Sequence, residues 1–133
     1  MVFYNIHIGG AMKILVVDDS LFQRKSICQI LADAGYETVE ATDGLDGLEK
    51  ALSIHPDCIL TDLLMPRMDG IELISELKAK GLAPPLFVLT ADIQESKRRL
   101  CIDLGVDGFL SKPPKKWELL GALNGYFKTH KGS

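Results

Sequence analysis

The stretch Ile14-Leu-Val-Val-Asp-Asp19 decides the fold of this chain. Four apolar residues in a row, three of them β-branched, are typical of a short strand that is buried on both faces of a parallel sheet. The pattern returns in Cys58-Ile-Leu-Thr-Asp62, where an apolar run again ends in an aspartate. Strand and helix patterns fill the chain between the two runs, so they are expected to be parallel strands that end at the same edge of one sheet.

The alternation of strand and helix continues through the rest of the chain. Further strands are predicted at 37–41, 86–89 and 108–110, and helices at 21–34, 44–53, 71–80, 95–104 and 116–127. Gly35, Gly81 and Gly105 stand where three of these helices should stop. The pattern predicts an α/β fold: a (βα)5 doubly wound parallel sheet of five strands in the flavodoxin-like order 2-1-3-4-5.

Length and composition indicate one ordinary globular domain. The chain has 133 residues, of which 47% are hydrophobic and 25% charged. Its net charge of −3 gives no general attraction to nucleic acid or an acidic membrane, and no apolar run approaches the ~18 residues of a membrane helix. Residues 1–12 are interpreted as a leader or alternative start outside the core, 13–128 as the domain and 129–133 as a frayed end.

The cysteines indicate a compartment. Cys28, Cys58 and Cys101 form neither a CxxC pair nor a disulfide framework. They are expected to be small buried hydrophobes, and a reducing cytoplasm suits them.

Polar residues stand where the predicted strands end. Asp18 and Asp19 follow the first strand, and Asp62, Thr90 and Lys112 follow the third, fourth and fifth. Because ligands of doubly wound sheets bind outside the carboxyl ends of the strands, these residues are expected to converge on one point. Taken singly, each has an ordinary alternative: the aspartate pair suits a helix N-cap, the threonine a strand end and the lysine a solvated surface. Their joint occurrence favours a functional site.

These residue types suit a cation and a phosphoryl group. Three close carboxylates repel one another unless a cation lies among them, and Mg²⁺ binds one or two carboxylates while keeping several waters. Asp19 and Asp62 are the expected direct ligands, Asp18 would hold a metal-bound water, and the backbone carbonyl of Leu64 is a further candidate. No His or Cys adjoins them, which disfavours zinc.

A carboxylate beside a metal can attack phosphorus, so Asp62 is a candidate nucleophile. The transition state spreads charge over three phosphoryl oxygens. Mg²⁺, the Lys112 ammonium, and the Thr90 hydroxyl with nearby backbone N–H groups would each neutralise one of them.

Four stretches of the chain resemble the receiver domains of two-component response regulators, and the resemblance runs from about residue 13 to 127. They are Ile14-Leu-Val-Val-Asp-Asp-Ser20, Leu60-Thr-Asp-Leu-Leu-Met-Pro-Arg-Met-Asp-Gly70, Val88-Leu-Thr-Ala91 and Phe109-Leu-Ser-Lys-Pro113. The resemblance implies the same fold and assigns each polar residue a role. Asp62 is the implied phosphoacceptor, Asp18 and Asp19 the acidic Mg²⁺ pair, Thr90 the switch hydroxyl and Lys112 the lysine that contacts the phosphoryl group.

The resemblance also implies a cis peptide bond at Lys112–Pro113 and makes Phe109 the switch aromatic whose rotamer follows Thr90. Family members often have Tyr at this position. Because Phe cannot donate a hydrogen bond, recognition of the outward state is expected to differ in detail. Leu64 and Asp92 occupy positions that tune phosphoryl lifetime. Leu64 cannot hold an attacking water, whereas Asp92 can, so slow to moderate self-hydrolysis is expected.

The chain is therefore expected to be a stand-alone signalling receiver, not an enzyme with its own substrate. A sensor histidine kinase or a histidine phosphotransfer protein would donate the phosphoryl group. Output would pass to a separate protein through the fourth helix, fifth strand and fifth helix, in chemotaxis-type control or a phosphorelay. A monomer or weak dimer is expected, with no direct contact to nucleic acid or membrane. The alternative is the N-terminal receiver of a longer regulator, for example a transcriptional one.

Three other classes fit the sequence less well. A phosphatase of the haloacid dehalogenase type needs a second Asp two residues after the nucleophile, where Leu64 stands. A flavin-binding electron carrier needs a phosphate cradle in the first strand–helix loop, and here that loop is the acidic Asp18-Asp-Ser-Leu-Phe22. A pseudo-receiver that only binds partners is disfavoured by the complete acidic and lysine set.

Overall fold

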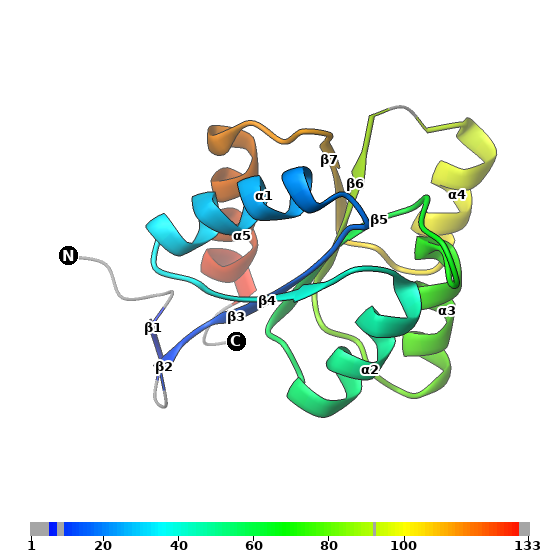
Figure 1. Ribbon diagram of the computed structural model, residues 1–133, viewed down its shortest axis with the longest axis horizontal. Coiled ribbons are helices and arrows are strands. Elements are labelled where there is room, and N and C mark those ends of the chain that lie inside the picture. The colour runs from blue at the N-terminus through cyan, green and yellow to red at the C-terminus, as the bar shows by residue number, and fades with distance from the viewer. Residues whose placement is uncertain (1–5, 8–9, 92, 131–133) are drawn as a thin grey trace.

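The computed structural model describes residues 6–7, 10–91 and 93–130, and its centre is a parallel sheet (Figure 1). The five strands lie in the order β4 (Glu37–Ala41), β3 (Lys13–Val17), β5 (Cys58–Asp62), β6 (Leu86–Thr90) and β7 (Gly108–Ser111). Counted along the chain from Lys13, this is the predicted order 2-1-3-4-5, which is confirmed. All four pairings between neighbouring strands are parallel.

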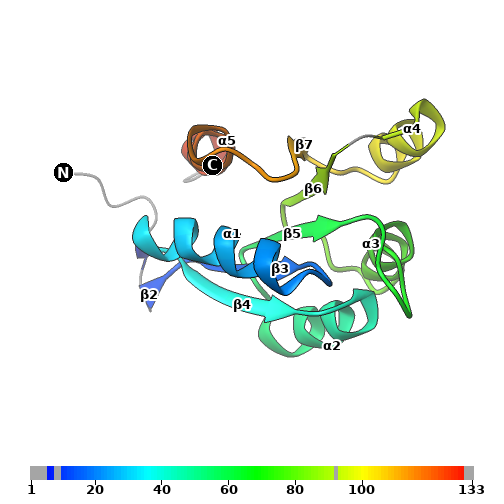
Figure 2. The same cartoon turned by 45° about the horizontal axis from the view of Figure 1, so that its top comes forward.

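Helices cover both faces of the sheet, as Figures 1 and 2 show. One face carries α1 (Leu21–Asp33) and α5 (Lys116–His130). The other face carries α2 (Gly44–Ile54), α3 (Gly70–Ala79) and α4 (Glu95–Asp103). Among the described residues, no helix is long and apolar enough to cross a membrane.

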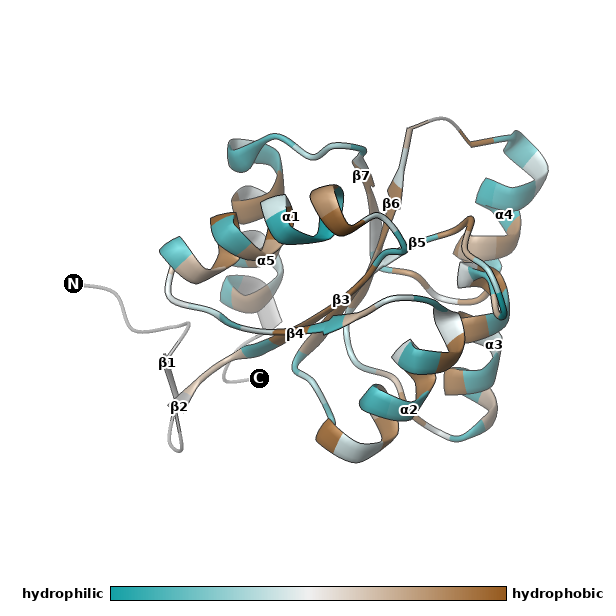
Figure 3. Cartoon of the chain, viewed as in Figure 1, coloured by the Kyte–Doolittle hydropathy of each residue, from teal (hydrophilic) through white to brown (hydrophobic). Residues whose placement is uncertain are grey.

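The central strand β3 supplies side chains to both faces of the sheet. Ile14 and Val16 belong to the core under α1 and α5, whereas Leu15 and Val17 belong to the core under α2 and α3. Successive side chains of a strand point to opposite faces, so a strand covered on both sides must be apolar throughout. Figure 3 shows the consequence as hydrophobic colour along the central strands.

The helix boundaries follow the expected capping chemistry. Ser20, Asp43 and Asp69 cap α1, α2 and α3, each accepting a hydrogen bond from a backbone N–H of the first turn. The predicted glycine stops are confirmed: Gly35, Gly81 and Gly105 all have positive φ, at 96°, 76° and 89°. The predicted boundaries are close to those observed, although α5 continues to His130.

A short antiparallel pair precedes the sheet. It joins β1 (Ile6–His7) to β2 (Gly10–Ala11), and Met12 then packs partly buried against the core beside α1. Residues 1–5, 8–9 and 131–133 lie outside the described residues. The domain limits of 13 and 128 stay a prediction.

Candidate functional site

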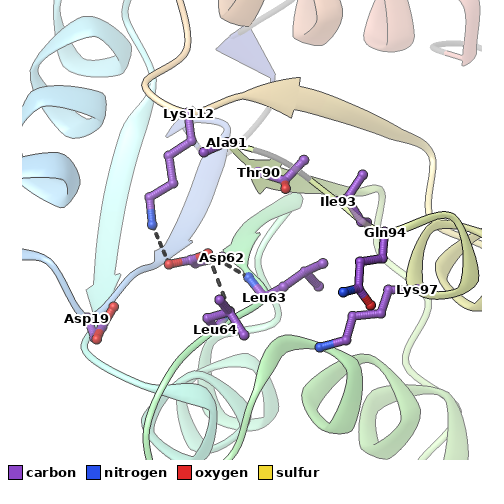
Figure 4. A pocket seen from close by; sticks show the side chains of 10 residues that line it. All are labelled: Asp19, Asp62, Leu63, Leu64, Thr90, Ala91, Ile93, Gln94, Lys97 and Lys112. Atoms are coloured by element: carbon purple, nitrogen blue, oxygen red, sulfur yellow. Dashed lines mark hydrogen bonds and ion pairs between the residues drawn. The ribbon is translucent and has the colours of Figure 1, made fainter.

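The carboxyl ends of four strands surround one pocket of about 510 Å³ (Figure 4). Asp19 follows β3, Asp62 ends β5, Thr90 ends β6 and Lys112 follows β7. The remaining lining residues come from the loops and helix beside them: Leu63, Leu64, Ala91, Ile93, Gln94 and Lys97. The parallel sheet therefore brings together the polar residues predicted from strand ends.

Three carboxylates form the acidic side of the site. Asp18, Asp19 and Asp62 each place one oxygen so that the three oxygens lie within 4.8 Å of one another. Asp18 is fully buried and Asp62 is 6% exposed, whereas Asp19 is open to solvent. Such a cluster of oxygen ligands suits a hard divalent cation, and it includes neither His nor Cys.

Lys112 reaches the acidic cluster from the end of β7. Its ammonium donates to Asp62 Oδ2, as Figure 4 shows, and lies 3.7 Å from Asp18 Oδ2. Partial burial alone would lower the pKa of Lys112, but the hydrogen bond and charge of Asp62, with the charge of Asp18, outweigh it and raise that pKa. Lys112 is therefore a fixed positive charge. The Lys112–Pro113 peptide bond is cis.

The two oxygens of Asp62 have different partners. Oδ1 accepts hydrogen bonds from the backbone N–H groups of Leu63, at 2.7 Å, and Leu64, at 3.4 Å. Oδ2 accepts from Lys112 instead. The carboxylate is thus held from both sides while it borders the pocket.

Asp18 supplies the clearest structural sign that a cation fits here. Its Oδ1 accepts a hydrogen bond from Ser20 N–H at 2.9 Å, but its buried Oδ2 has no hydrogen-bond partner. Burial raises the pKa of Asp18, and the Ser20 hydrogen bond and the Lys112 charge only partly oppose that rise. A divalent cation held by this cluster would compensate the buried charge.

Other predicted residues lie around this centre. Thr90 borders the pocket, and Leu64 exposes 72% of its surface. Phe109 is partly buried on β7, and the Arg98 guanidinium lies 4.4 Å from its ring centroid. Asp92, the other residue expected to tune phosphoryl lifetime, lies outside the described residues.

The sequence patterns missed several residues of the site. Ile93, Gln94 and Lys97 extend the pocket towards α4, and no local pattern distinguishes them from ordinary surface residues. Arg24 is buried and donates to the backbone carbonyl of Asp18. A signal for Arg24 did exist, because it stands at helical spacing from Ile27, Cys28 and Leu31 on the buried stripe of α1.

A doubly wound sheet with an acidic cluster and a lysine at its carboxyl edge is the arrangement that the resemblance to receiver domains predicts. The chain belongs to the response regulator receiver domain family, which it matches over residues 14–124. Receiver domains of this family act in two-component signalling, with histidine kinases and downstream effectors as partners.

Known relatives agree with this assignment. The chain is 38% identical over 120 residues to the response regulator MprA of Mycobacterium avium, covering 90% of this chain and 53% of that protein. It therefore spans about half the length of the curated relatives it matches.

Solved structures with this fold include the chemotaxis response regulator CheY4 of Vibrio cholerae. That similarity has a TM-score of 0.80 at 34% identity and covers 86% of this chain and 97% of that one. A CheX–CheY complex with BeF3 and magnesium from Borrelia burgdorferi matches with a TM-score of 0.85 at 26% identity, covering 92% of this chain and 96% of that one.

Proposed function

We propose that this chain is a receiver that accepts a phosphoryl group on Asp62 in a Mg²⁺-dependent reaction and signals by changing its affinity for a partner protein. The observation that carries the proposal is the position of Asp62. Its carboxylate borders an open pocket between the acidic pair Asp18 and Asp19 and the Lys112 ammonium.

In the proposed reaction, an Asp62 carboxylate oxygen attacks phosphorus and the bond to the donor breaks, its electron pair leaving with the donor. Mg²⁺ would be held by Asp19, Asp62, the Leu64 carbonyl and, through a water, Asp18. When bound, it neutralises charge on the carboxylates and on one phosphoryl oxygen. The Lys112 ammonium would move its hydrogen bond from Asp62 to a second phosphoryl oxygen. The Thr90 hydroxyl, with nearby backbone N–H groups, would donate to the third phosphoryl oxygen. The Leu63 and Leu64 N–H groups, which donate to Asp62 Oδ1, orient the carboxylate for attack.

The output surface in this proposal is the α4–β7–α5 face. Helix α4 buries only Cys101, so its remaining side chains are available to a partner. Phe109 of β7 would change rotamer with Thr90 and leave its contact with Arg98.

The pathway is also a proposal. A histidine kinase or a histidine phosphotransfer protein in the cytoplasm would donate the phosphoryl group. Output would pass through a separate protein, as in chemotaxis-type signalling, without direct contact to nucleic acid or membrane. The receiver would be a monomer or weak dimer. The likeness to chemotaxis receivers supports this reading. The greater length of the MprA relatives supports the alternative that the chain is the receiver of a longer regulator.

Intact mass spectrometry after incubation with Mg²⁺ and a small acyl phosphate tests the proposal. We expect one phosphoryl adduct, lost when EDTA replaces Mg²⁺ and lost in Asp62→Asn, which preserves the shape of the side chain. An adduct that persists in Asp62→Asn would contradict the assignment. Spectra taken over time also test slow self-hydrolysis, expected because Leu64 offers no polar side chain to an attacking water.

A further inference from the structure

Arg24 is a charged residue buried within helix α1. It is 7% exposed and lies on the face of the helix that packs against the sheet. Burial of an ion costs free energy unless the ion is paired and its donors are used. Two partners use the guanidinium here: Nη1 donates to the backbone carbonyl of Asp18 at 2.8 Å, and Nε donates to Glu40 Oε1 at 2.8 Å.

Pairing with Glu40 alone does not explain why an arginine is buried at position 24. Glu40 lies on β4, is partly exposed, and also accepts a hydrogen bond from Lys25 through Oε2 at 2.8 Å. Lys25 is 62% exposed at its side chain, so it neutralises Glu40 without burial. What Arg24 adds is the bond to Asp18, which joins α1, β4 and the end of β3 through one planar group.

The Asp18 carbonyl belongs to the peptide unit that links the two acidic residues. A peptide unit is planar, so holding the Asp18 oxygen orients the whole plane and the start of Asp19. The remaining bonds of Asp18 complete the restraint: its N–H donates to the Ala41 carbonyl at 3.1 Å, and its Oδ1 accepts from Ser20 N–H. The remaining oxygen, Asp18 Oδ2, is buried and has no hydrogen bond, and Asp18 belongs to the acidic cluster.

We propose that Arg24 is a positioning residue for the divalent cation: anchored by Glu40, it holds the Asp18–Asp19 peptide plane so that both carboxylates face Asp62. This inference rests on the proposed cation site. Groups that orient metal ligands commonly change metal affinity 10- to 100-fold when they are lost.

The sign of the effect separates positioning from simple electrostatics. A guanidinium near the site repels a divalent cation, so its removal would strengthen Mg²⁺ binding if charge were all that mattered. If Arg24 positions the acidic pair, its removal weakens Mg²⁺ binding instead. A purely structural role would lower the stability of the fold and leave the Mg²⁺ affinity of the folded protein unchanged.

The test is a Mg²⁺ titration without phosphodonor, followed by two-dimensional NMR, in wild type, Arg24→Met, Arg24→Lys and Lys25→Met. We expect about 10-fold weaker binding in Arg24→Met and partial recovery in Arg24→Lys, whose ammonium keeps the charge but not the planar fork. Lys25→Met removes the other ion-pair partner of the Glu40 carboxylate and should bind Mg²⁺ like the wild type. If Arg24→Met does not fold, Arg24→Gln removes the same charge but keeps a polar side chain, and it should also weaken binding.

Equal or tighter Mg²⁺ binding in folded Arg24→Met, or in Arg24→Gln where it replaces that variant, would overturn the inference while leaving the cation site in place. Equal weakening in Lys25→Met would also overturn it, because the effect would then belong to the charge around Glu40. Absence of Mg²⁺ binding in the wild type would overturn both the inference and the proposed function.

Discussion

Asp43 serves two parts of the structure at once. Its Oδ1 caps α2 by accepting from Asp46 N–H at 2.8 Å, and its Oδ2 accepts from Arg67 Nε at 2.7 Å. Arg67 belongs to the loop that follows Asp62 and has a φ of 69°, a left-handed conformation that disfavours a residue with a side chain. The ion pair therefore helps to hold the loop that carries the Leu63 and Leu64 amides.

The stability of the domain should depend on the charge of Asp43. The Arg67 hydrogen bond lowers the pKa of Asp43 below its ordinary value. A depressed carboxyl pKa contributes stability above the unfolded value of about 3.9, and that contribution is lost as pH falls through the folded value. Asp43→Asn keeps a good cap but loses the charge, so we expect it to be less stable than wild type near neutral pH and more nearly equal at about pH 3.

Urea unfolding at both pH values measures this difference. Arg67→Gly removes the partner of Asp43, and glycine suits the positive φ at this position. Like Asp43→Asn, this variant should be less stable than wild type near neutral pH and more nearly equal to it at about pH 3. A stability gap between wild type and Asp43→Asn that is as large at about pH 3 as near neutrality would contradict the role of the ion pair.

Among the secondary elements, α2 begins in close contact with the loop after β5. Gly44, the first residue of α2, donates its N–H to the Met68 carbonyl at 3.0 Å, and a Cβ at Gly44 would overlap that carbonyl oxygen. Helix α4 differs in kind, since only Cys101 of its residues is buried. The closely packed α2 and the loosely packed α4 therefore lie on the same face of the sheet.

Two glycine substitutions should have opposite effects on stability. Gly44→Ala forces backbone apart and should destabilise the domain by about 1–3 kcal/mol. Gly121→Ala changes an exposed position inside α5 with no heavy atom within 4 Å of the added carbon, so it should stabilise by roughly 0.5–1 kcal/mol through helix propensity. Urea denaturation measures both. A neutral Gly44→Ala would show that the loop moves freely away from α2.

At the scale of the whole molecule, one sheet separates two hydrophobic cores. Leu123 of α5 belongs to the first core and Leu73 of α3 to the second, and both are fully buried. The two cores share the backbone of β3, whose alternate side chains enter each of them. Loss of packing in one core should therefore be transmitted to the other.

Leu123→Ala and Leu73→Ala should each destabilise the protein by about 2–5 kcal/mol, with a single unfolding transition in both cases. Trp117, exposed on α5, reports by fluorescence on one side of the sheet, and far-UV circular dichroism reports on all helices. Coincident curves are expected. Separate transitions by the two probes would show that the cores unfold independently.

Much of the fold follows from local pattern alone. The apolar runs at β3 and β5 and the glycines after α1, α3 and α4 predict the order of elements, because strand burial and helix termination depend on nearby residues. The polar residues at strand ends predict the site for a similar reason, since parallel strands deliver their carboxyl ends to one edge.

The sequence by itself therefore determined the alternation of strands and helices, the strand order and the gathering of Asp18, Asp19, Asp62, Thr90 and Lys112. Only the tertiary structure decided that Arg24 bonds Asp18 and Glu40, that Asp43 pairs with Arg67, and that Lys97 faces the pocket. These contacts join residues from different elements. They depend on the rotation of each helix about its axis and on the path of each loop, which are set by packing across the whole molecule and not by any local pattern.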